Sequence, residues 1–215
     1  MAEYFSITRP FLSDDLIMLK KYLKPNSKVL DLGMGNGRLS TIVNYKINID
    51  YIGIDVSEKM VRIASKNYPD CKFLLQKNPL KIDFENSTFD RVFCLSVFHH
   101  IPSYEYRLAY LKEIKRVLKK EGIVVMLNWN LWPKKGTCLK VLLDFFKHRE
   151  LDLKDIYLPF KNEEGKNLTN RYIHCFSKYE LDNLLAKAGF AVKESTVLKR
   201  GRKISNSNFL HILSK

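Results

Sequence analysis

The hydrophobic positions of this chain follow two alternating patterns. Short, nearly continuous apolar runs are typical of strands buried in a parallel sheet, and they predict strands near 27–32, 49–54, 71–75, 89–95, 122–129, 190–197 and 207–213. Between these runs, apolar residues recur every three or four positions, as in amphipathic helices. This second pattern predicts helices near 13–23, 37–45, 57–66, 104–119, 137–149 and 178–188.

The alternation of strands and helices predicts an α/β fold with a doubly wound, mostly parallel seven-stranded sheet. We expect residues 1–215 to form a single domain. Ser57 is suited to cap the helix that follows it, and Gly122 is suited to end a helix in a left-handed conformation and begin the fifth strand.

One long segment does not fit a minimal domain of this kind. Residues 130–176 separate the fifth strand from the last helix and mix aromatic with basic side chains. Ligands of doubly wound sheets bind beyond the carboxyl ends of the strands, and this insert leaves the sheet at such an end. The insert is therefore a candidate substrate lid, with a purely structural role as the alternative.

The first predicted strand runs directly into a glycine-rich loop. Gly33, Gly35 and Gly37 form a G-x-G-x-G pattern, so the backbone there can lie against a ligand. The second strand ends at Asp55, whose carboxylate is suited to accept hydrogen bonds from the two hydroxyls of a ribose. A dinucleotide loop would have a small residue where Arg38 stands, and the Gly-Lys-Ser/Thr of a triphosphate loop is absent from the sequence. The pattern indicates a nucleoside cofactor, although the glycines alone would also suit a tight turn.

The composition narrows the class of protein. With 215 residues, 46% of them hydrophobic, the chain can build one sizeable core. Because no apolar run approaches the roughly 20 residues of a membrane span and the start lacks a signal-peptide pattern, we expect a cytoplasmic protein with no membrane partner. The four cysteines lack metal-ligand spacing, so we expect reduced thiols and no bound metal.

The charge balance suggests a polyanionic partner. Lys and Arg number 37 against 23 Asp and Glu, giving a net charge of +14. Such an excess favours binding to nucleic acid, unless the lysines only face water. The run 199–203 holds four cations around Gly201 between the last two strands, and we expect it to form a hairpin tip that contacts RNA phosphates.

Polar residues follow the fourth and fifth predicted strands at the same edge of the sheet. His99 and His100 come after the fourth strand, and Asn128, Trp129 and Asn130 leave the fifth. These side chains are candidates for substrate contact, with hydrogen bonds that merely brace the loops as the alternative.

Several of these elements together resemble a known family. The spacing of Gly33 to Gly37 is similar to motif I of the class I S-adenosylmethionine-dependent methyltransferases. Residues 2–9, the double histidine, residues 155–160, residues 171–181 and the pair 208–209 resemble elements of the wobble-uridine tRNA methyltransferases, which esterify 5-carboxymethyluridine. The resemblance covers nearly the whole chain. It implies a Rossmann-like methyltransferase fold with the last strand antiparallel, S-adenosylmethionine as cofactor, tRNA as partner and a small zinc-binding activator subunit as a further possible partner.

The resemblance also suggests which residues form the site. Cofactor contacts are expected from Asp31, Gly33, Gly35, Gly37, Asp55, Val56, Asn78, Leu80 and Ser96. Residues expected to position the acceptor are Arg9, Arg171 and His174, assisted by His99 or His100. The family usually has Asp-Ala where Asn78 and Pro79 stand, and since proline has no N–H to donate, cofactor binding should be weakened.

A carboxylate acceptor is already ionised at neutral pH, so transfer of a methyl group to it needs no general base. We therefore expect an enzyme that works mainly by orientation. Two other functions remain open at this stage: an O- or C-methyltransferase that acts on small molecules, and a cofactor-binding protein without turnover, suggested by Asn78 and Pro79.

Overall fold

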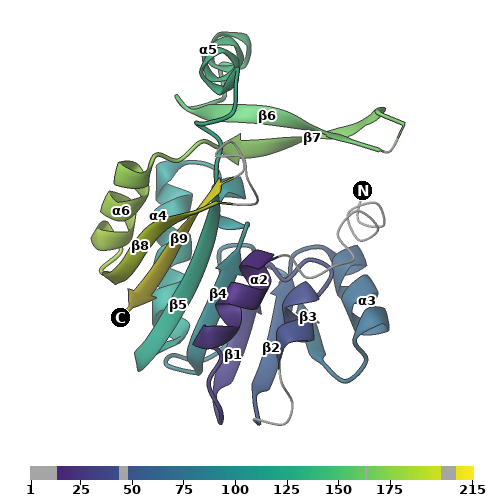
Figure 1. The fold of residues 1–215 in the computed structure, drawn as a ribbon, viewed down its shortest axis with the longest axis vertical. Helices are drawn as coiled ribbons and strands as arrows, with labels where there is room; N and C mark the ends of the chain where they lie inside the picture. The colour runs from purple at the N-terminus through teal and green to yellow at the C-terminus, as the bar shows by residue number, and fades with distance from the viewer. Residues whose placement is uncertain (1–13, 44–47, 163, 200–206) are drawn as a thin grey trace.

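A computed structural model describes residues 14–43, 48–162, 164–199 and 207–215 as a sheet flanked by helices (Figure 1). The strands of the central sheet are β1 (Lys28–Leu32), β2 (Asp50–Asp55), β3 (Lys72–Leu75), β4 (Phe89–Leu95), β5 (Leu118–Asn130), β8 (Ala191–Lys199) and β9 (Ser207–Ser214). Their order is β3-β2-β1-β4-β5-β9-β8. The pairs among β1 to β5 are parallel, whereas β9 is antiparallel to both β5 and β8. The predicted doubly wound, mostly parallel sheet with an antiparallel last strand is confirmed.

Two hydrophobic cores lie on opposite faces of this sheet. The helical elements outside the insert are α2 (Asp14–Leu19), η1 (Lys20–Tyr22), η2 (Arg38–Ile42), α3 (Glu58–Asn67), η4 (Phe98–His100), α4 (Tyr104–Val117) and α6 (Lys178–Lys187). Val92 of β4 packs with α4 and α6 on one face, and its neighbour Phe93 packs with α2 and η2 on the other. Because side chains alternate along a strand, continuous apolar runs are needed to fill both cores.

The helix expected at 37–45 is instead the short 3-10 helix η2, which ends at Ile42. Gly122 was expected to end a helix, and this is wrong, because it lies inside β5 and its φ is not in the left-handed region. The backbone of the buried Leu118 already pairs with Phe89, so pairing with β4 ends helix α4 at Val117. Ser57 caps α3 as predicted, since its hydroxyl accepts the N–H of Met60.

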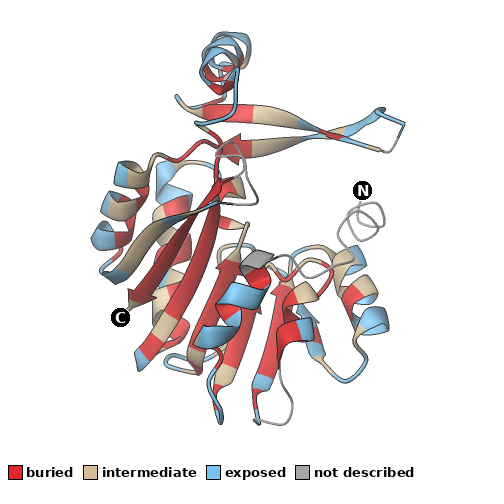
Figure 2. Cartoon of the chain, viewed as in Figure 1, coloured by how far each residue is buried: buried red, intermediate tan, exposed pale blue. Residues whose placement is uncertain are grey.

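The insert folds around a small core of its own. It contains α5 (Thr137–Lys147), which was predicted, and an antiparallel pair that was not, β6 (Asp155–Lys161) and β7 (Asn167–His174). Val141 of α5, Ile156 of β6 and Ile173 of β7 pack with Leu131, which follows β5, and with Cys175, which follows β7. The insert lies beyond one end of the central sheet (Figure 1), and its outer parts are exposed while the central strands are buried (Figure 2).

Among the described helices, none has the length and apolar character that crossing a membrane would require.

Candidate active site

One cavity is lined by residues from both the central sheet and the insert. It has a volume of about 670 Å³ and lies where the carboxyl ends of β1, β2 and β4 meet. Loops after these strands form one side, and Trp129 of β5 and Arg171 of β7 line the other. The residues predicted for the site that do line it are Gly33, Gly35, Asp55, Val56, Ser96, His100 and Arg171.

The glycine loop brings bare backbone to this cavity. The N–H groups of Gly33 and Met34 donate to the carbonyl of Ile54, at 2.8 and 3.0 Å, and so fix the loop to β2. Gly33 has a φ of +72°, and a Cβ at this position would overlap the side chain of Val97. Gly37 also has a positive φ, but it packs against Phe73 and does not line the cavity. Its role is close packing behind the loop.

Asp55 lies at the end of β2 with both carboxylate oxygens facing N–H donors. Oδ2 accepts from Gly35 at 2.9 Å and Oδ1 accepts from Ser57 at 2.8 Å. Burial raises the pKa of this carboxyl, although both hydrogen bonds act in the opposite direction. Each oxygen of a carboxylate has more than one acceptor site, so Asp55 can still accept from two ligand hydroxyls.

Asp31 does not line the cavity. It is 3% exposed, and its Oδ2 accepts the Tyr51 hydroxyl at 2.7 Å. Burial raises its pKa to about 7, against the opposing effect of the Tyr51 hydrogen bond. The structure therefore places Asp31 behind the glycine loop, as a support for β1 and β2.

The loop after β3 also differs from the expected arrangement. Asn78 and Leu80 lie outside the cavity, and the Asn78 Oδ1 accepts the N–H of Leu80 at 2.9 Å. Gln76 and Pro79 line the cavity instead. The buried Gln76 donates through Nε2 to the carbonyls of Pro79 and Lys81, at 3.3 and 3.2 Å. Both Nε2 protons are directed at the loop, which leaves Oε1 as the acceptor of this amide.

Arg171 places a positive charge in the cavity wall. Its guanidinium carbon lies 5.4 Å from the ring centroid of Trp129 and 5.0 Å from that of Phe160. Burial lowers the pKa of Arg171, and Nε is a buried donor without a hydrogen-bond partner. Among the described residues, no carboxylate lies within ion-pairing distance of this guanidinium. A half-buried cation of this kind is suited to bind an anion.

The two adjacent histidines have different positions. His100 lines the cavity, and its Nδ1 is 2.8 Å from the carbonyl oxygen of Tyr172, so this nitrogen must be the donor. His99 is completely buried and does not line the cavity. Its ring packs against that of Trp129, with the ring centroids 4.7 Å apart, and the backbone N–H of Trp129 points to His99 Nδ1 at 3.5 Å. His99 thus supports the Trp129 side of the cavity.

His174 is 3% exposed and lies outside the cavity, in a polar network that attaches the insert. Its Nδ1 is 2.6 Å from Asp155 and its Nε2 is 2.8 Å from Glu180. The buried Arg107 of α4 donates to the Tyr172 hydroxyl at 2.6 Å and pairs with Asp155 at 3.4 Å. These contacts hold β7, and with it Arg171, against the body of the protein.

Arg9 and the cations at 200–203 lie outside the described residues, so their predicted roles stay predictions. Lys199 is opposite Ser207 in the pairing of β8 with β9. Neither Asn128 nor Asn130 lines the cavity, whereas Trp129 does. Gln76, Met60 and Tyr110 also line the cavity, although they were not predicted to do so. Tyr110 lies on the helical face that fills the core, so no sequence signal separates it from ordinary core residues.

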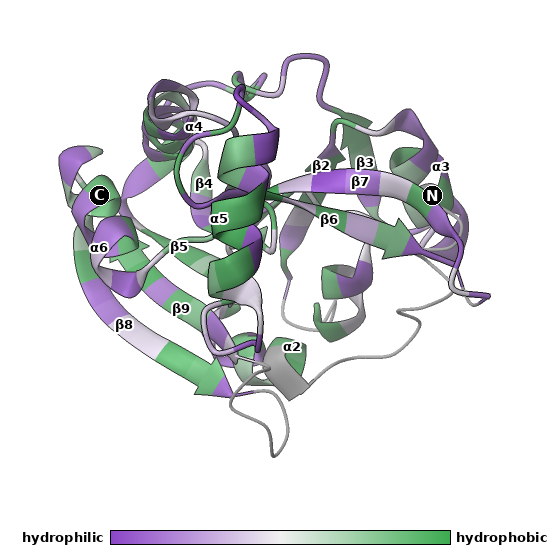
Figure 3. Ribbon diagram, turned by 90° about the horizontal axis from the view of Figure 1, so that it is seen from above, coloured by the Kyte–Doolittle hydropathy of each residue, from purple (hydrophilic) through white to green (hydrophobic). Residues whose placement is uncertain are grey.

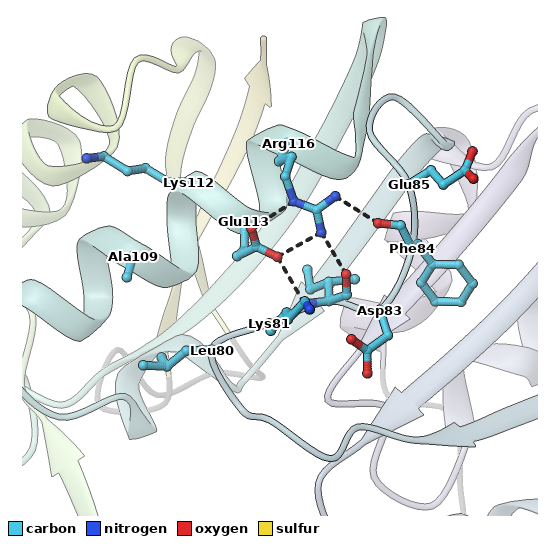
Figure 4. A pocket seen from close by; sticks show the side chains of 10 residues that line it. Leu80, Lys81, Asp83, Phe84, Glu85, Ala109, Lys112, Glu113 and Arg116 are labelled. Carbon is cyan, nitrogen blue, oxygen red and sulfur yellow. Dashed lines mark hydrogen bonds and ion pairs between the residues drawn. The ribbon is translucent and has the colours of Figure 1, made fainter.

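A second hollow, of about 900 Å³, lies between α4 and the loop after β3 (Figure 4). Arg116 in its wall donates to Glu113 and to the carbonyls of Ile82 and Phe84. Its charge is therefore already compensated by the protein, unlike that of Arg171. No group of three or more potential metal ligands occurs in the described part of the chain.

Comparison with known proteins identifies the class. A family model described as "Methyltransferase domain" matches residues 30–126. The tRNA (carboxymethyluridine(34)-5-O)-methyltransferase of Schizosaccharomyces pombe is 28% identical over 90% of this chain and 86% of its own length. The ubiquinone/menaquinone biosynthesis C-methyltransferase UbiE of Campylobacter jejuni is 26% identical over 81% of this chain and 75% of its length. A structure of a SAM-dependent methyltransferase from Methanosarcina mazei superimposes with a TM-score of 0.77 at 22% identity, covering 92% of this chain and 96% of that one.

The fold, the glycine loop with Asp55 and these matches define the chain as a class I S-adenosylmethionine-dependent methyltransferase. The site fits this cofactor, since Gly33 and Gly35 present bare backbone to the cavity and Asp55 retains acceptors for ribose hydroxyls. When bound, S-adenosylmethionine supplies an electrophilic methyl group. Within this class, the relatives include enzymes of both tRNA and quinone metabolism.

Proposed function

We propose that the enzyme methylates a carboxylate acceptor, the carboxymethyl group of a modified uridine in tRNA. The observation that carries the proposal is Arg171, a cation in the cavity wall with no ion-pair partner among the described residues. Support also comes from the Schizosaccharomyces pombe relative, which matches over most of the chain, and from the net charge of +14.

The chemistry required of the protein is modest in this case. A carboxylate with an ordinary pKa is ionised at neutral pH, so no side chain needs to remove a proton. The protein has to orient the acceptor, and orientation can contribute about 7–11 kcal/mol. Arg171 would bind the carboxylate from the insert side, and Trp129 and Phe160 hold its guanidinium in place. His100, tied to the Tyr172 carbonyl, fixes the loop after β4 relative to β7.

Variants of Arg171 test this assignment. Arg171→Gln should lower kcat/KM for tRNA containing 5-carboxymethyluridine by about 10- to 100-fold, because a charge-assisted hydrogen bond to the acceptor is lost. Arg171→Lys keeps the charge but lacks the planar guanidinium, so its kcat/KM should lie between those of the wild type and of Arg171→Gln. Cofactor affinity, measured by calorimetry, should not change. Lys161→Gln, at an exposed β6 position, is the matched control. Turnover of Arg171→Gln equal to wild type would refute the role of Arg171.

A small-molecule O- or C-methyltransferase is the second candidate, and one observation favours it. With Nδ1 of His100 donating to the Tyr172 carbonyl, the neutral ring carries its lone pair on Nε2, as a general base would. The Campylobacter jejuni relative supports this alternative. A phenolic acceptor would give a rate that rises with pH through the titration of the base, whereas a carboxylate acceptor would give a flat profile at neutral pH.

The partners implied by the proposal are tRNA and a small zinc-binding activator subunit, and the location implied is the cytoplasm. Incubation with labelled cofactor and total RNA, followed by nucleoside digestion, tests the RNA substrate. Label that appears only in a metabolite extract would favour the small-molecule alternative.

A further inference from the structure

Helix α5 has an inverted distribution of polar and apolar side chains. Its buried face includes Thr137, whose hydroxyl donates to the Leu131 carbonyl at 2.7 Å, and Asp144, which accepts the Tyr157 N–H at 2.8 Å. Val141 is the apolar residue between them. Surface helices normally bury the apolar face and expose the polar one. The inner side of α5 is thus partly polar and already satisfied.

The outer side of α5 is mainly apolar. Its exposed large residues are Leu139, Leu142, Leu143, Phe145 and Phe146. Phe146 is 73% exposed and Leu139 is 60% exposed. These positions recur at intervals of three and four, so they form one continuous stripe, which we call the α5 face. Contiguous apolar surface of this kind on a soluble protein marks an interaction site.

The position of the α5 face makes it accessible. Helix α5 lies at the end of the molecule farthest from the lower edge of the sheet (Figure 1), and apolar residues extend along it when the molecule is viewed from above (Figure 3). None of the described hydrophobic clusters includes the five residues of this face.

Positive charges flank the α5 face at both ends. Lys134 and Lys135 precede the helix, Lys147 ends it and Arg149 follows it, and all four are exposed. Lys135 directly precedes Gly136, the N-cap of α5, and Arg149 directly follows His148, its C-cap, so these cations lie close to the two ends of the α5 face. Two exposed acids, Glu150 and Asp152, follow on one side only. The surface that covers this face should therefore be apolar in the middle and negatively charged around it.

We propose that the α5 face docks on the surface of an anionic lipid bilayer. A helix with an apolar stripe and flanking cations lies in the interface between headgroups and acyl chains, where both sets of side chains find partners. Each basic residue near an anionic membrane strengthens binding by about fivefold.

A second copy of the chain fits the α5 face less well. In an antiparallel pair of α5 helices, Lys134 and Lys135 of one copy would meet Lys147 and Arg149 of the other. A helix of 11 residues is only about 16 Å long and cannot supply the roughly 800 Å² per partner of a typical stable interface.

This contact differs from membrane crossing. The expectation of no membrane partner rested on the lack of a long apolar run, and a helix that lies flat in the interface needs no such run. The proposal does not depend on the identity of the methyl acceptor, because vesicle binding is measured without turnover.

Vesicle flotation of the full chain tests the proposal. We expect binding to vesicles of phosphatidylcholine containing phosphatidylserine, weaker binding to phosphatidylcholine alone, and a loss of binding at high salt. The double variant Leu142→Glu/Phe146→Glu should reduce binding by about tenfold or more, since it places two charges on the apolar stripe. Replacing the four flanking cations by Gln should remove the preference for anionic vesicles.

The matched control is Ile17→Glu, at an apolar position of α2 that is 54% exposed and lies outside the insert. This variant should bind vesicles like wild type. All variants should retain the wild-type melting temperature and cofactor affinity, because each changed side chain is exposed. Failure of the wild type to bind anionic vesicles, or equal binding by the Leu142→Glu/Phe146→Glu variant, would overturn the proposal. So would a wild-type dimer in sedimentation velocity that this variant dissociates, since the face would then belong to a second copy.

Discussion

The two sides of the cavity are built in different ways. On the cofactor side, main-chain hydrogen bonds from Gly33 and Met34 to Ile54 fix the loop to strands inside the core. On the insert side, Arg171 is held by side chains, through Arg107, Asp155 and their partners. A backbone site depends on the stability of the whole sheet, whereas a side-chain network can fail locally. Cofactor binding and acceptor positioning should therefore be separable by mutation.

The largest expected effect comes from Arg107→Leu. This change leaves the buried Asp155 without its arginine partner and the Tyr172 hydroxyl without its donor. Breaking a buried ion pair costs about 3–5 kcal/mol. We expect the lost stability to appear as local detachment of the insert. Hydrogen exchange in β6 and β7 should become faster and turnover should be lost, whereas cofactor affinity should be retained.

Arg116→Leu is the control for this variant, because Arg116 lies on the same helix but contacts Glu113 and the loop after β3 (Figure 4). It should leave hydrogen exchange in the insert unchanged. If Arg107→Leu instead lowers cofactor affinity as much as turnover, the two sides are not independent.

Two glycines test whether close packing at the glycine loop matters for the cofactor side of the cavity. Gly33 and Gly136 both have a positive φ, but a Cβ at Gly33 would overlap Val97 whereas a Cβ at Gly136 meets nothing within 4 Å. The left-handed conformation alone costs alanine about 1–2 kcal/mol, and crowding adds about 1–3 kcal/mol. Gly33→Ala should therefore lower the free energy of unfolding clearly more than Gly136→Ala, and only Gly33→Ala should weaken cofactor binding. Urea denaturation measures the free energy of unfolding, and calorimetry measures the affinity for the cofactor. Equal effects would mean that the loop yields to the added methyl group.

Asp55 and Asp31 provide the next comparison, between an acid in the cavity and one behind it. Asp55→Ala should weaken cofactor binding by about 1.5–3 kcal/mol, since hydrogen bonds to a charged acceptor are lost. Asp31→Asn should leave cofactor affinity near wild type, because the side chain of Asp31 faces Tyr51 and not the cavity. Calorimetric titration with S-adenosylmethionine distinguishes the two. If Asp31→Asn weakened cofactor binding more than Asp55→Ala, Asp31 would be the residue that binds the cofactor.

The sequence predicted the cofactor side better than the insert side, for physical reasons. Continuous apolar runs define β1, β2 and β4 because these strands are buried on both faces, and the glycines mark where backbone must replace side chains. In β6 and β7, exposed polar residues and Pro159 interrupt the apolar run that would indicate a strand. These two strands are therefore recognised only from their pairing in the structure, for example of Tyr157 with Tyr172.

Residue roles in the insert were also beyond sequence reasoning. Arg171 and His174 are three positions apart on β7, so they lie on opposite faces of this strand, which the sequence did not predict. The first lines the cavity and the second lies between Asp155 and Glu180. A histidine between two carboxylates is recognised only when all three elements are in place. For α5, the periodic pattern predicted a helix, but it could not show that the apolar stripe faces outward.

The smallest expected effect concerns pH and the attachment of the insert. Partial burial on its own would raise the pKa of Glu180, but hydrogen bonds from His174 and Lys154 outweigh it and lower the pKa to about 2. A carboxyl whose pKa is lower in the folded state than in the unfolded chain stabilises the folded state at pH values above the unfolded-state pKa. This stabilisation is lost as the pH falls toward the folded-state pKa. Attachment of the insert should therefore weaken as the pH falls from about 4.5 toward 2, measured by proteolysis within residues 148–176. Glu180→Gln should reduce this pH dependence, because Gln does not titrate and can still accept the hydrogen bond that closes the cap at Ser177. If proteolysis of the insert in this variant depends on pH as it does in the wild type, other carboxyls control the attachment of the insert. The network around His174 would then not be what connects the two sides of the cavity.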